Sequence, residues 1–424
     1  MKTTQTQKQT LKELVSKYDH VALALQGGGA LGSYQAGVYE GLCDLDIEPT
    51  RIVGTSIGAL NSAIIAGNTP KNRVKALKDF WNTICKTNMS PYDFGLNHDW
   101  INSLSLDIRK FFSATSATRS MIEGQNGFFK PKMPNLNPFR IQNPNEISYY
   151  NIDNLKETLN KFVDFDLINS KKIHLSVGAV NIRTGQLHYF DNLKTVLRAE
   201  HFIASGALPP GFPAVEIDGE YYWDGGIVSN TPLEHILTDK ERNNTLVFQV
   251  DLWSSYGDTP KNMSDVSERV KDIQYSSRTR LITHIMSEEQ KNKRILQELL
   301  KKIPEEIKEN DHWCKVATKQ SEHTKMNIIQ LIYRDKHFEG HYKDYEFSSP
   351  TMSEHWSSGL NDIHETMKNQ NWLLMPSDEK GFVTHDIHRN TSTSAKAKSA
   401  FSLREINSKE EIQSFKTIDE ITVV

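Results

Sequence analysis

The sequence contains few cysteines, no long apolar run and no large excess of either charge. Its 424 residues include only Cys43, Cys85 and Cys314, a set too sparse for a disulfide framework or a cysteine-based zinc module. No segment approaches the length of about 18 apolar residues that a membrane span needs, and Met1–His20 lacks the apolar core of a secretory signal. The formal net charge of −3 argues against a nucleic-acid partner, because proteins that bind nucleic acids normally carry a basic patch. These absences predict a soluble, cytoplasmic protein.

A glycine-rich loop follows the first predicted strand. Val21–Leu25 is a continuous apolar run, typical of a strand buried on both faces of a parallel sheet. The chain then passes through the loop Gly27–Gly32 into a helix predicted over Ser33–Cys43. A loop between strand and helix presents backbone N–H groups to an anion. The pattern Gly27-x-Gly29-x-x-Gly32 fits a nucleotide phosphate site, and the same loop fits an oxyanion hole.

The next unit carries a serine turn. A short strand over Arg51–Val53 leads into Gly54-Thr55-Ser56-Ile57-Gly58 and then into a helix that extends to Ala66. Gly-x-Ser-x-Gly is the nucleophile-elbow pattern, in which a sharp strand-to-helix turn lifts the serine hydroxyl clear of its neighbours. A dinucleotide site would instead need an acidic residue at the end of this strand, and Glu48 lies before it. The serine turn therefore favours the oxyanion-hole interpretation of the preceding loop.

An aspartate occupies the end of a later strand. Val215–Trp223 reads as a hairpin about Asp218-Gly219, and it leads directly into Asp224-Gly225-Gly226. A further hairpin is predicted over Lys172–Asp191, a helix over Leu193–Ser205 and an apolar strand over Thr245–Trp253. Because strands and helices alternate up to this point, we expect a mainly parallel sheet covered by helices on both faces.

Taken together, these motifs carry a family resemblance. Gly27–Gly32, Gly54–Gly58 and Asp224–Gly226 occur in that order, with Ala204-Ser205-Gly206-Ala207-Leu208-Pro209 shortly before the last. In this arrangement the sequence resembles the patatin-like phospholipase family over about residues 18–253. The remainder resembles the extra C-terminal region of one bacterial subgroup of that family.

The resemblance implies a three-layer α/β/α hydrolase that cleaves fatty-acyl esters of phospholipids or lysophospholipids without a cofactor or a metal. The resemblance implies that Ser56 is the nucleophile and Asp224 the base. It also implies that the N–H groups around Gly27, Gly28 and Gly29 form the oxyanion hole. The remaining motif glycines support the turns: Gly32, Gly54, Gly58, Gly225 and Gly226. A carboxylate with a pKa near 4 is a weak base, so Asp224 would need desolvation or hydrogen bonds to act. Leu31 departs from the Arg or Lys that the family commonly carries at this position.

The chain divides into five predicted regions. They are a polar lead-in over 1–17, the hydrolase domain over 18–253, an irregular insertion within it at about 88–150, a mainly helical region over 254–384 and a disordered tail over 385–424. The insertion mixes aromatic and basic residues, which fits either a peripheral contact with a lipid surface or packing on the body through its aromatics. We favour packing on the sequence alone.

Other interpretations remain open. His235, His284 and His385 follow Asp224, so residue order permits a Ser–Asp–His triad, and the spacing of His337 and His341 permits a metal site on a helix. A catalytically weak protein that binds lipids or a partner on the same fold is the alternative function. The sequence does not specify the oligomeric state.

Overall fold

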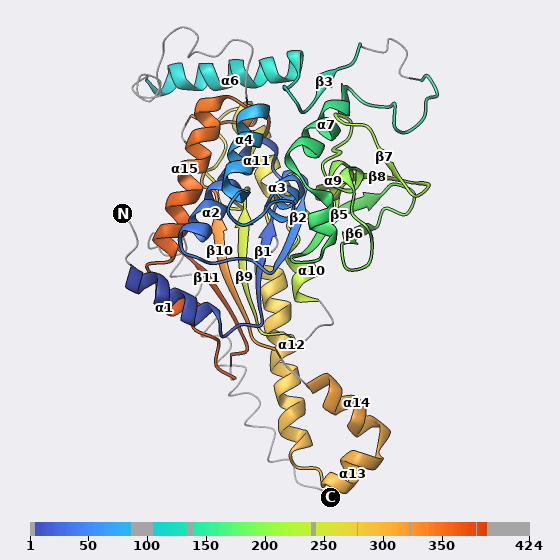
Figure 1. Ribbon diagram of the computed structural model, residues 1–424, viewed down its shortest axis with the longest axis vertical. Helices are drawn as coiled ribbons and strands as arrows, with labels where there is room; N and C mark the ends of the chain where they lie inside the picture. Colours follow the sequence, from blue (N-terminus) through green and yellow to red (C-terminus); the bar gives the residue numbers. More distant parts are fainter. Residues whose placement is uncertain are drawn as a thin grey trace, which may run out of the picture. The chain divides into compact units, whose positions relative to one another are not determined.

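A mainly parallel sheet of nine strands, counted over the described residues, organises the computed structural model (Figure 1). The structure describes residues 5–85, 105–133, 139–238, 243–277, 279–321, 324–336, 338–378 and 380–387. The strand order is β11-β10-β9-β1-β2-β5-β8-β7, and β6 pairs with β5. The strands are β1 His20–Leu25, β2 Arg51–Thr55, β5 His174–Asn181, β6 Leu187–Asp191, β7 Val215–Ile217, β8 Glu220–Asp224, β9 Thr245–Asp251, β10 Met326–Ile332 and β11 Phe382–Asp386.

The helices fall between these strands as the alternating pattern predicted. They are α1 Gln5–Val15, α2 Ser33–Asp44, α3 Ile57–Ala66, α4 Arg73–Ile84, α6 Leu106–Glu123, α7 Asp153–Phe162, α8 Phe165–Asn169, α9 Ala199–Ser205, α10 Leu233–Leu237, α11 Met263–Tyr275, α12 Thr279–Leu300, α13 Glu305–Asn310, α14 His312–Ser321 and α15 Ser349–Thr366. Within the described residues, no helix combines the length and apolarity that crossing a membrane requires.

The register of the parallel strands aligns the ends that carry the motifs. Leu25 of β1 pairs with Gly54 of β2 on one side and with Val250 of β9 on the other. Thr55 pairs with Gly178 of β5. The residues that follow β1 and β2 therefore emerge side by side at one edge of the sheet, where ligand sites of such sheets form.

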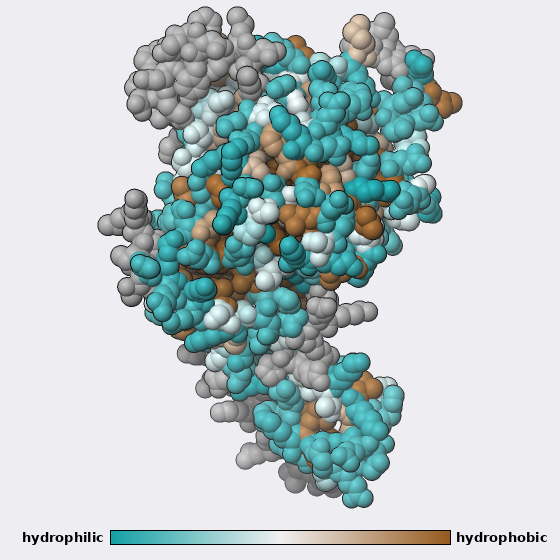
Figure 2. Space-filling model, in the orientation of Figure 1, coloured by the Kyte–Doolittle hydropathy of each residue, from teal (hydrophilic) through white to brown (hydrophobic). Residues whose placement is uncertain are grey.

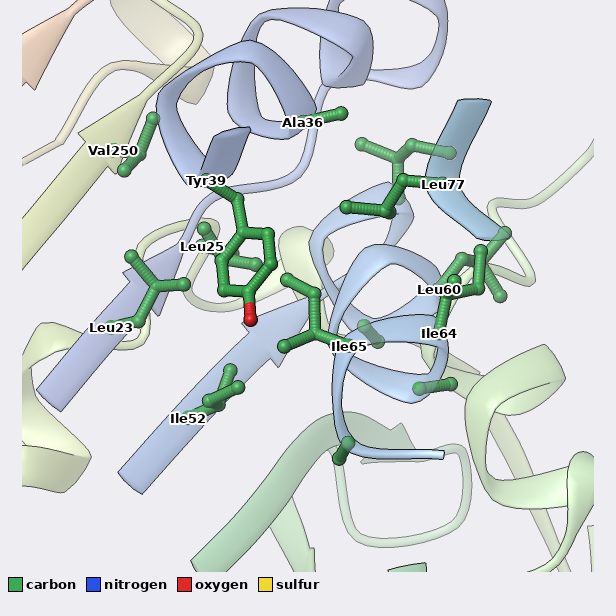
Figure 3. Packing of buried hydrophobic residues seen from close by; sticks show 14 of the residues in the cluster. Leu23, Leu25, Ala36, Tyr39, Ile52, Leu60, Ile64, Ile65, Leu77 and Val250 are labelled. Carbon is green, nitrogen blue, oxygen red and sulfur yellow. The ribbon is translucent and has the colours of Figure 1, made fainter. Parts of the chain in front are cut away.

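The two faces of the sheet bury different sides of each strand. Leu23 and Leu25 point toward the layer formed by α2, α3 and α4, where Figure 3 shows them packed near Tyr39, Ile65 and Val250. Ala22 and Ala24 alternate with them and face the layer that contains α10 and α12. Each fully buried Leu contributes roughly 1.5–3 kcal/mol. The expected three-layer α/β/α architecture is confirmed.

The C-terminal region shares the core of the hydrolase domain. β10 and β11 extend the same sheet beyond β9, and Met1–His385 forms one compact unit. Helix α15 approaches α2 closely: a Cβ on Gly37 would lie 1.9 Å from the Trp356 carbonyl oxygen, and one on Gly359 would lie 2.0 Å from the Tyr34 carbonyl oxygen. These glycines permit backbone contact between the helices. The tail after residue 387, predicted to be disordered, lies outside the described residues.

Two expectations about local structure were wrong. The insertion, predicted to be irregular, contains the 18-residue helix α6. Its inward face carries Ser113, Ala117 and Ser120 in place of large apolar residues, so apolar periodicity did not reveal a helix. The helix predicted over Leu193–Ser205 begins only at Ala199, because the preceding residues form a turn on Asp191.

Candidate active site

Ser56 lies on the strained turn that the elbow pattern predicted. It has φ 56° and ψ −126° and precedes α3, a backbone conformation that costs of order 1–3 kcal/mol in a non-glycine residue. The flanking glycines make the turn possible. A Cβ on Gly54 would lie 2.5 Å from the Gly58 carbonyl oxygen, and a Cβ on Gly58 would lie 2.3 Å from the Leu25 carbonyl oxygen.

Asp224 lies beside Ser56, at the end of β8. The Asp224 carboxylate is buried, accepts a hydrogen bond from the Ser56 side chain and accepts another from the Gly226 N–H at 2.7 Å. Burial raises the pKa of Asp224 to about 7, and the two hydrogen bonds from Ser56 and Gly226 oppose that rise. A carboxyl group with this pKa can accept and release a proton near neutral pH.

The glycine loop also reaches Ser56. A Cβ on Gly27 would lie 2.9 Å from Ser56 Cβ and 2.3 Å from Asn230 Oδ1. The Gly27 N–H donates to the Asn230 carbonyl at 3.2 Å. The Gly27 carbonyl accepts from Asn230 Nδ2 at 3.1 Å and from Trp253 Nε1 at 2.9 Å. Both polar backbone groups of Gly27 are therefore engaged in holding the loop.

Gly28 and Gly29 differ from Gly27. Within the described part of the chain, neither the Gly28 N–H nor the Gly29 N–H donates a hydrogen bond to a protein acceptor. Gly29 has φ 54°, and a Cβ there would lie 2.1 Å from the Asp344 carbonyl oxygen. Adjacent N–H groups without an acceptor, in a loop whose Gly27 packs against Ser56, are available to an anionic oxygen.

Three side chains that received no role from the sequence support this arrangement. Ser205 Oγ accepts from the Ser56 N–H at 3.0 Å and donates to the Gly178 carbonyl at 2.6 Å. Asn230 and Trp253 anchor Gly27 as described above. Ser205 belongs to the segment that contributed to the family resemblance, so its position carried a signal. Trp253 and Asn230 carried none, because their contacts depend on the folding of distant segments.

The C-terminal region contacts the same loop through the short helix η4, Lys343–Tyr345. The buried Lys343 ammonium lies 2.7 Å from Asp272, 2.6 Å from Asp335 and 5.0 Å from the centre of the Trp253 ring. Burial lowers the pKa of Lys343, but the carboxylates of Asp335 and Asp272 outweigh it and hold the pKa above its usual value. Glu268, Asp272 and Asp335 have the spacing of a cation site, and the Lys343 ammonium already forms ion pairs with Asp272 and Asp335.

The candidate histidines lie elsewhere. His235 stacks on Tyr189 with ring centroids 3.9 Å apart, and His385 stacks on Trp372 at 5.1 Å. His284 lies in α12. Within the described residues, the groups that hydrogen-bond to the Asp224 carboxylate are the Ser56 side chain and the Gly226 N–H, so the geometry gives no support to a triad.

The predicted histidine pair can be followed only in part. His337 lies outside the described residues, and His341 Nδ1 lies 3.1 Å from Ser264 Oγ. The contact with Ser264 accounts for one of the two ring nitrogens of His341.

Comparison with known proteins supports the hydrolase interpretation. Residues 23–237 match the family model described as patatin-like phospholipase, and residues 273–379 match a second one described as patatin phospholipase. A search among curated proteins finds no match. The crystal structure of VipD from Legionella pneumophila is similar at 16% sequence identity and a TM-score of 0.38, over 93% of this chain and 77% of that one.

The first of these matches spans just over half of the chain and contains the serine turn, the glycine loop and Asp224. The second shows that the C-terminal region, which contacts the glycine loop through η4, is also characteristic of such proteins. The chain belongs to the patatin-like phospholipase family, and it is on that ground a lipid acyl hydrolase.

Proposed function

We propose that the protein hydrolyses fatty-acyl esters of phospholipids or lysophospholipids with Ser56 and Asp224 as a catalytic dyad. One observation carries the proposal: the side chain of Ser56, on a strained turn, hydrogen-bonds to a buried carboxylate. A serine hydroxyl is a weak nucleophile unless an adjacent base accepts its proton. Asp224 is that base.

The reaction proceeds in two halves. Ser56 Oγ attacks the ester carbonyl carbon while its proton passes to Asp224, and the carbonyl oxygen becomes an oxyanion. Asp224 then protonates the departing alcohol, which leaves the acyl group on Ser56. A water molecule gives its proton to Asp224, attacks the acyl carbon and releases the fatty acid, and the proton returns to Ser56 Oγ.

The geometry favours Gly28 and Gly29 as the donors to the oxyanion. The family resemblance placed Gly27 among the donors, but the Gly27 N–H donates to the Asn230 carbonyl. The Ser56 N–H likewise donates to Ser205 Oγ. We therefore assign Gly27 to the framework that orients the loop. Loss of one oxyanion-hole donor costs about 2.7–4 kcal/mol of transition-state stabilisation, or about 10²–10³ in kcat.

Hydrolysis assays of the purified protein with Ser56→Ala and Asp224→Asn test the dyad. Either change should lower kcat by about 10⁴ or more, as removal of a member of a nucleophile–base unit does. Asp218→Asn is the matched control, since Asp218 lies exposed on the hairpin that delivers Asp224. Full activity in either dyad variant would refute the assignment.

Binding of lipids without turnover is a second candidate function. Leu31 is fully buried in the hydrophobic core, so this position offers no charge to an oxyanion or a headgroup. An assay across lipid classes separates the two functions: release of fatty acid supports the hydrolase, and lipid binding with no release supports the alternative.

A further inference from the structure

Helix α6 turns its small side chains inward and its large apolar side chains outward. Ser113, Ala117 and Ser120 form the buried face, whereas Phe111 is 70% exposed and Ile122 is 68% exposed. A surface helix of a globular protein normally has the opposite distribution. Contiguous exposed apolar side chains mark a site of contact with a partner or a membrane.

Three of the outward apolar residues form a stripe together with two threonines. Ile108, Phe111, Thr115, Thr118 and Ile122 follow one another at spacings of three and four, which places them on one side of the helix. The stripe contains no charged residue, and all five residues are exposed. A helix side of this kind suits the boundary between headgroups and acyl chains.

Exposed apolar residues continue into the segment that follows α6. Met133, Ile141 and Tyr149 flank the short sheet of β3 (Lys130–Pro131) and β4 (Tyr150–Asn151), and Ile141 is 97% exposed. Figure 2 shows apolar residues at the upper right rim of the molecule, over the segment between β3 and β4. We call these residues the docking face: Ile108, Phe111, Ile122, Met133, Ile141 and Tyr149.

The first part of the docking face is tied to the glycine loop. Tyr342, next to η4, donates its hydroxyl hydrogen to the Lys110 carbonyl at 3.1 Å. Asp344 of η4 packs its carbonyl against Gly29. A single short helix therefore separates α6 from the loop beside Ser56.

The second part is tied to Asp224. The Tyr150 hydroxyl donates to the Met121 carbonyl at 2.9 Å, and the Tyr150 N–H donates to the Gly211 carbonyl at 2.9 Å. A few residues before Gly211, the Ala207 carbonyl accepts from the Asp224 N–H at 3.0 Å. Figure 1 accordingly shows α6 and β3 beyond the C-terminal ends of β1 and β9. The docking face thus lies at the catalytic end of the sheet.

The charge of this region differs from that of the whole chain. Residues 105–151 contain six basic and three acidic residues, a net charge of +3, whereas the whole chain carries −3. Among the basic residues, Lys130 and Arg140 are exposed within the segment that carries Met133 and Ile141. A locally positive apolar surface on an otherwise negative protein is complementary to anionic lipid headgroups.

We propose that the docking face seats the protein on the surface of an anionic phospholipid bilayer, with the site at Ser56 turned toward the lipid. The apolar side chains enter the boundary between headgroups and acyl chains, and the basic side chains contact the phosphates. A bilayer is favoured over a protein partner because the family acts on lipid esters and the face lies at the catalytic end. The inference rests on that lipid substrate class and not on the identity of the dyad.

Binding to vesicles tests the inference. The full chain carrying Ser56→Ala, which leaves the lipid intact, is sedimented with vesicles of phosphatidylcholine alone or mixed with phosphatidylglycerol. Added Phe111→Ser and Ile122→Ser should weaken binding to the mixed vesicles at least about tenfold, because two large apolar groups no longer leave water. The matched control is Ile285→Ser with Ile295→Ser on α12, where the side chains are 55% and 50% exposed, and it should bind as the parent does.

Two results would overturn the inference. One is equal binding by the Phe111/Ile122 variant and the parent, and the other is equal or tighter binding to phosphatidylcholine alone. Lys130→Gln with Arg140→Gln should reduce the preference for the mixed vesicles and its dependence on salt. Hydrolysis of a short-chain, water-soluble ester by the protein with Ser56 intact is scored separately. Its absence would count against the proposed function while leaving the vesicle result valid.

Discussion

The glycine loop and helix α6 lie at the same end of the sheet and are built in opposite ways. In the loop the backbone itself is packed: Gly29 meets the Asp344 carbonyl, and a single added carbon would lie 2.1 Å from its oxygen. On α6 the small residues Ser113 and Ala117 face the body, and large apolar side chains such as Phe111 face outward. One region leaves no room for a methyl group, and the other leaves whole side chains uncovered.

The difference separates two tasks of a lipid hydrolase. Transition-state stabilisation needs donors fixed to within a fraction of an ångström, and hydrogen bonds from Asn230 and Trp253 hold the loop accordingly. Contact with a fluid bilayer needs apolar area without a fixed shape. Substitutions in the loop should therefore lower activity, and substitutions on the exposed side of α6 should weaken membrane binding.

Outside the dyad, the largest effect is expected from Gly29→Ala. The positive φ of Gly29 and the nearby Asp344 carbonyl force the loop to move, which should lower kcat by about 10²–10³ as the oxyanion donors shift. Gly206→Ala is the matched control, because a Cβ there would meet no atom closer than 3.8 Å. Steady-state kinetics on folded protein make the comparison. Equal kcat values for the two variants would show that the loop tolerates displacement.

The pH dependence of kcat/KM should report Asp224. Its pKa of about 7, raised by burial, means that the base form is lost as pH falls, so kcat/KM should drop about tenfold for each pH unit below 7. Above that pH the rate should level off. If kcat/KM for a soluble ester stays constant down to pH 5, a group other than Asp224 accepts the proton of Ser56.

The Ser56→Gly variant should be modestly more stable than the Ser56→Ala variant. Glycine relieves the cost of φ 56° but loses more entropy on folding, so we expect a net gain of about 1 kcal/mol relative to Ser56→Ala. Chemical denaturation of the two inactive variants measures the difference. A less stable Ser56→Gly would mean that the turn stores no strain.

The smallest effect is expected from Phe111→Ser. The side chain is mostly exposed, so stability should change by no more than about 0.5 kcal/mol and hydrolysis of a soluble ester should be unaffected. Ala117→Leu, on the buried face of α6, should instead destabilise by about 1–3 kcal/mol through overpacking. Thermal melts of both variants test whether α6 faces the body as described.

The sequence predicted the parts of the site that depend on local backbone. Strand, glycine loop and helix around Gly27, and strand, turn and helix around Ser56, follow from spacing alone, and the structure confirms those elements. It also brings Asp224, 168 residues after Ser56 in the numbering, into hydrogen-bond contact with it. Family resemblance, rather than spacing, anticipated that contact.

Other features could not be predicted because they depend on tertiary contacts. The Gly27 N–H is engaged by Asn230, which reaches it from a segment that is remote in sequence. The contact of η4 with Gly29 requires the C-terminal region to fold onto the loop. Helix α6 was not predicted because its buried side carries small residues such as Ser113 and Ala117. A helix is recognised in a sequence by large apolar residues that recur on its buried side.

The most direct test of the dyad is covalent labelling of Ser56 by a fluorophosphonate, followed by mass spectrometry over a range of pH. We expect an adduct on Ser56 whose rate of formation rises through about pH 7 with the ionisation of Asp224. Asp224→Asn should abolish that rise and slow labelling throughout. An adduct on another residue, or labelling of Asp224→Asn at the parent rate, would contradict the assignment of Ser56 and Asp224 as the dyad.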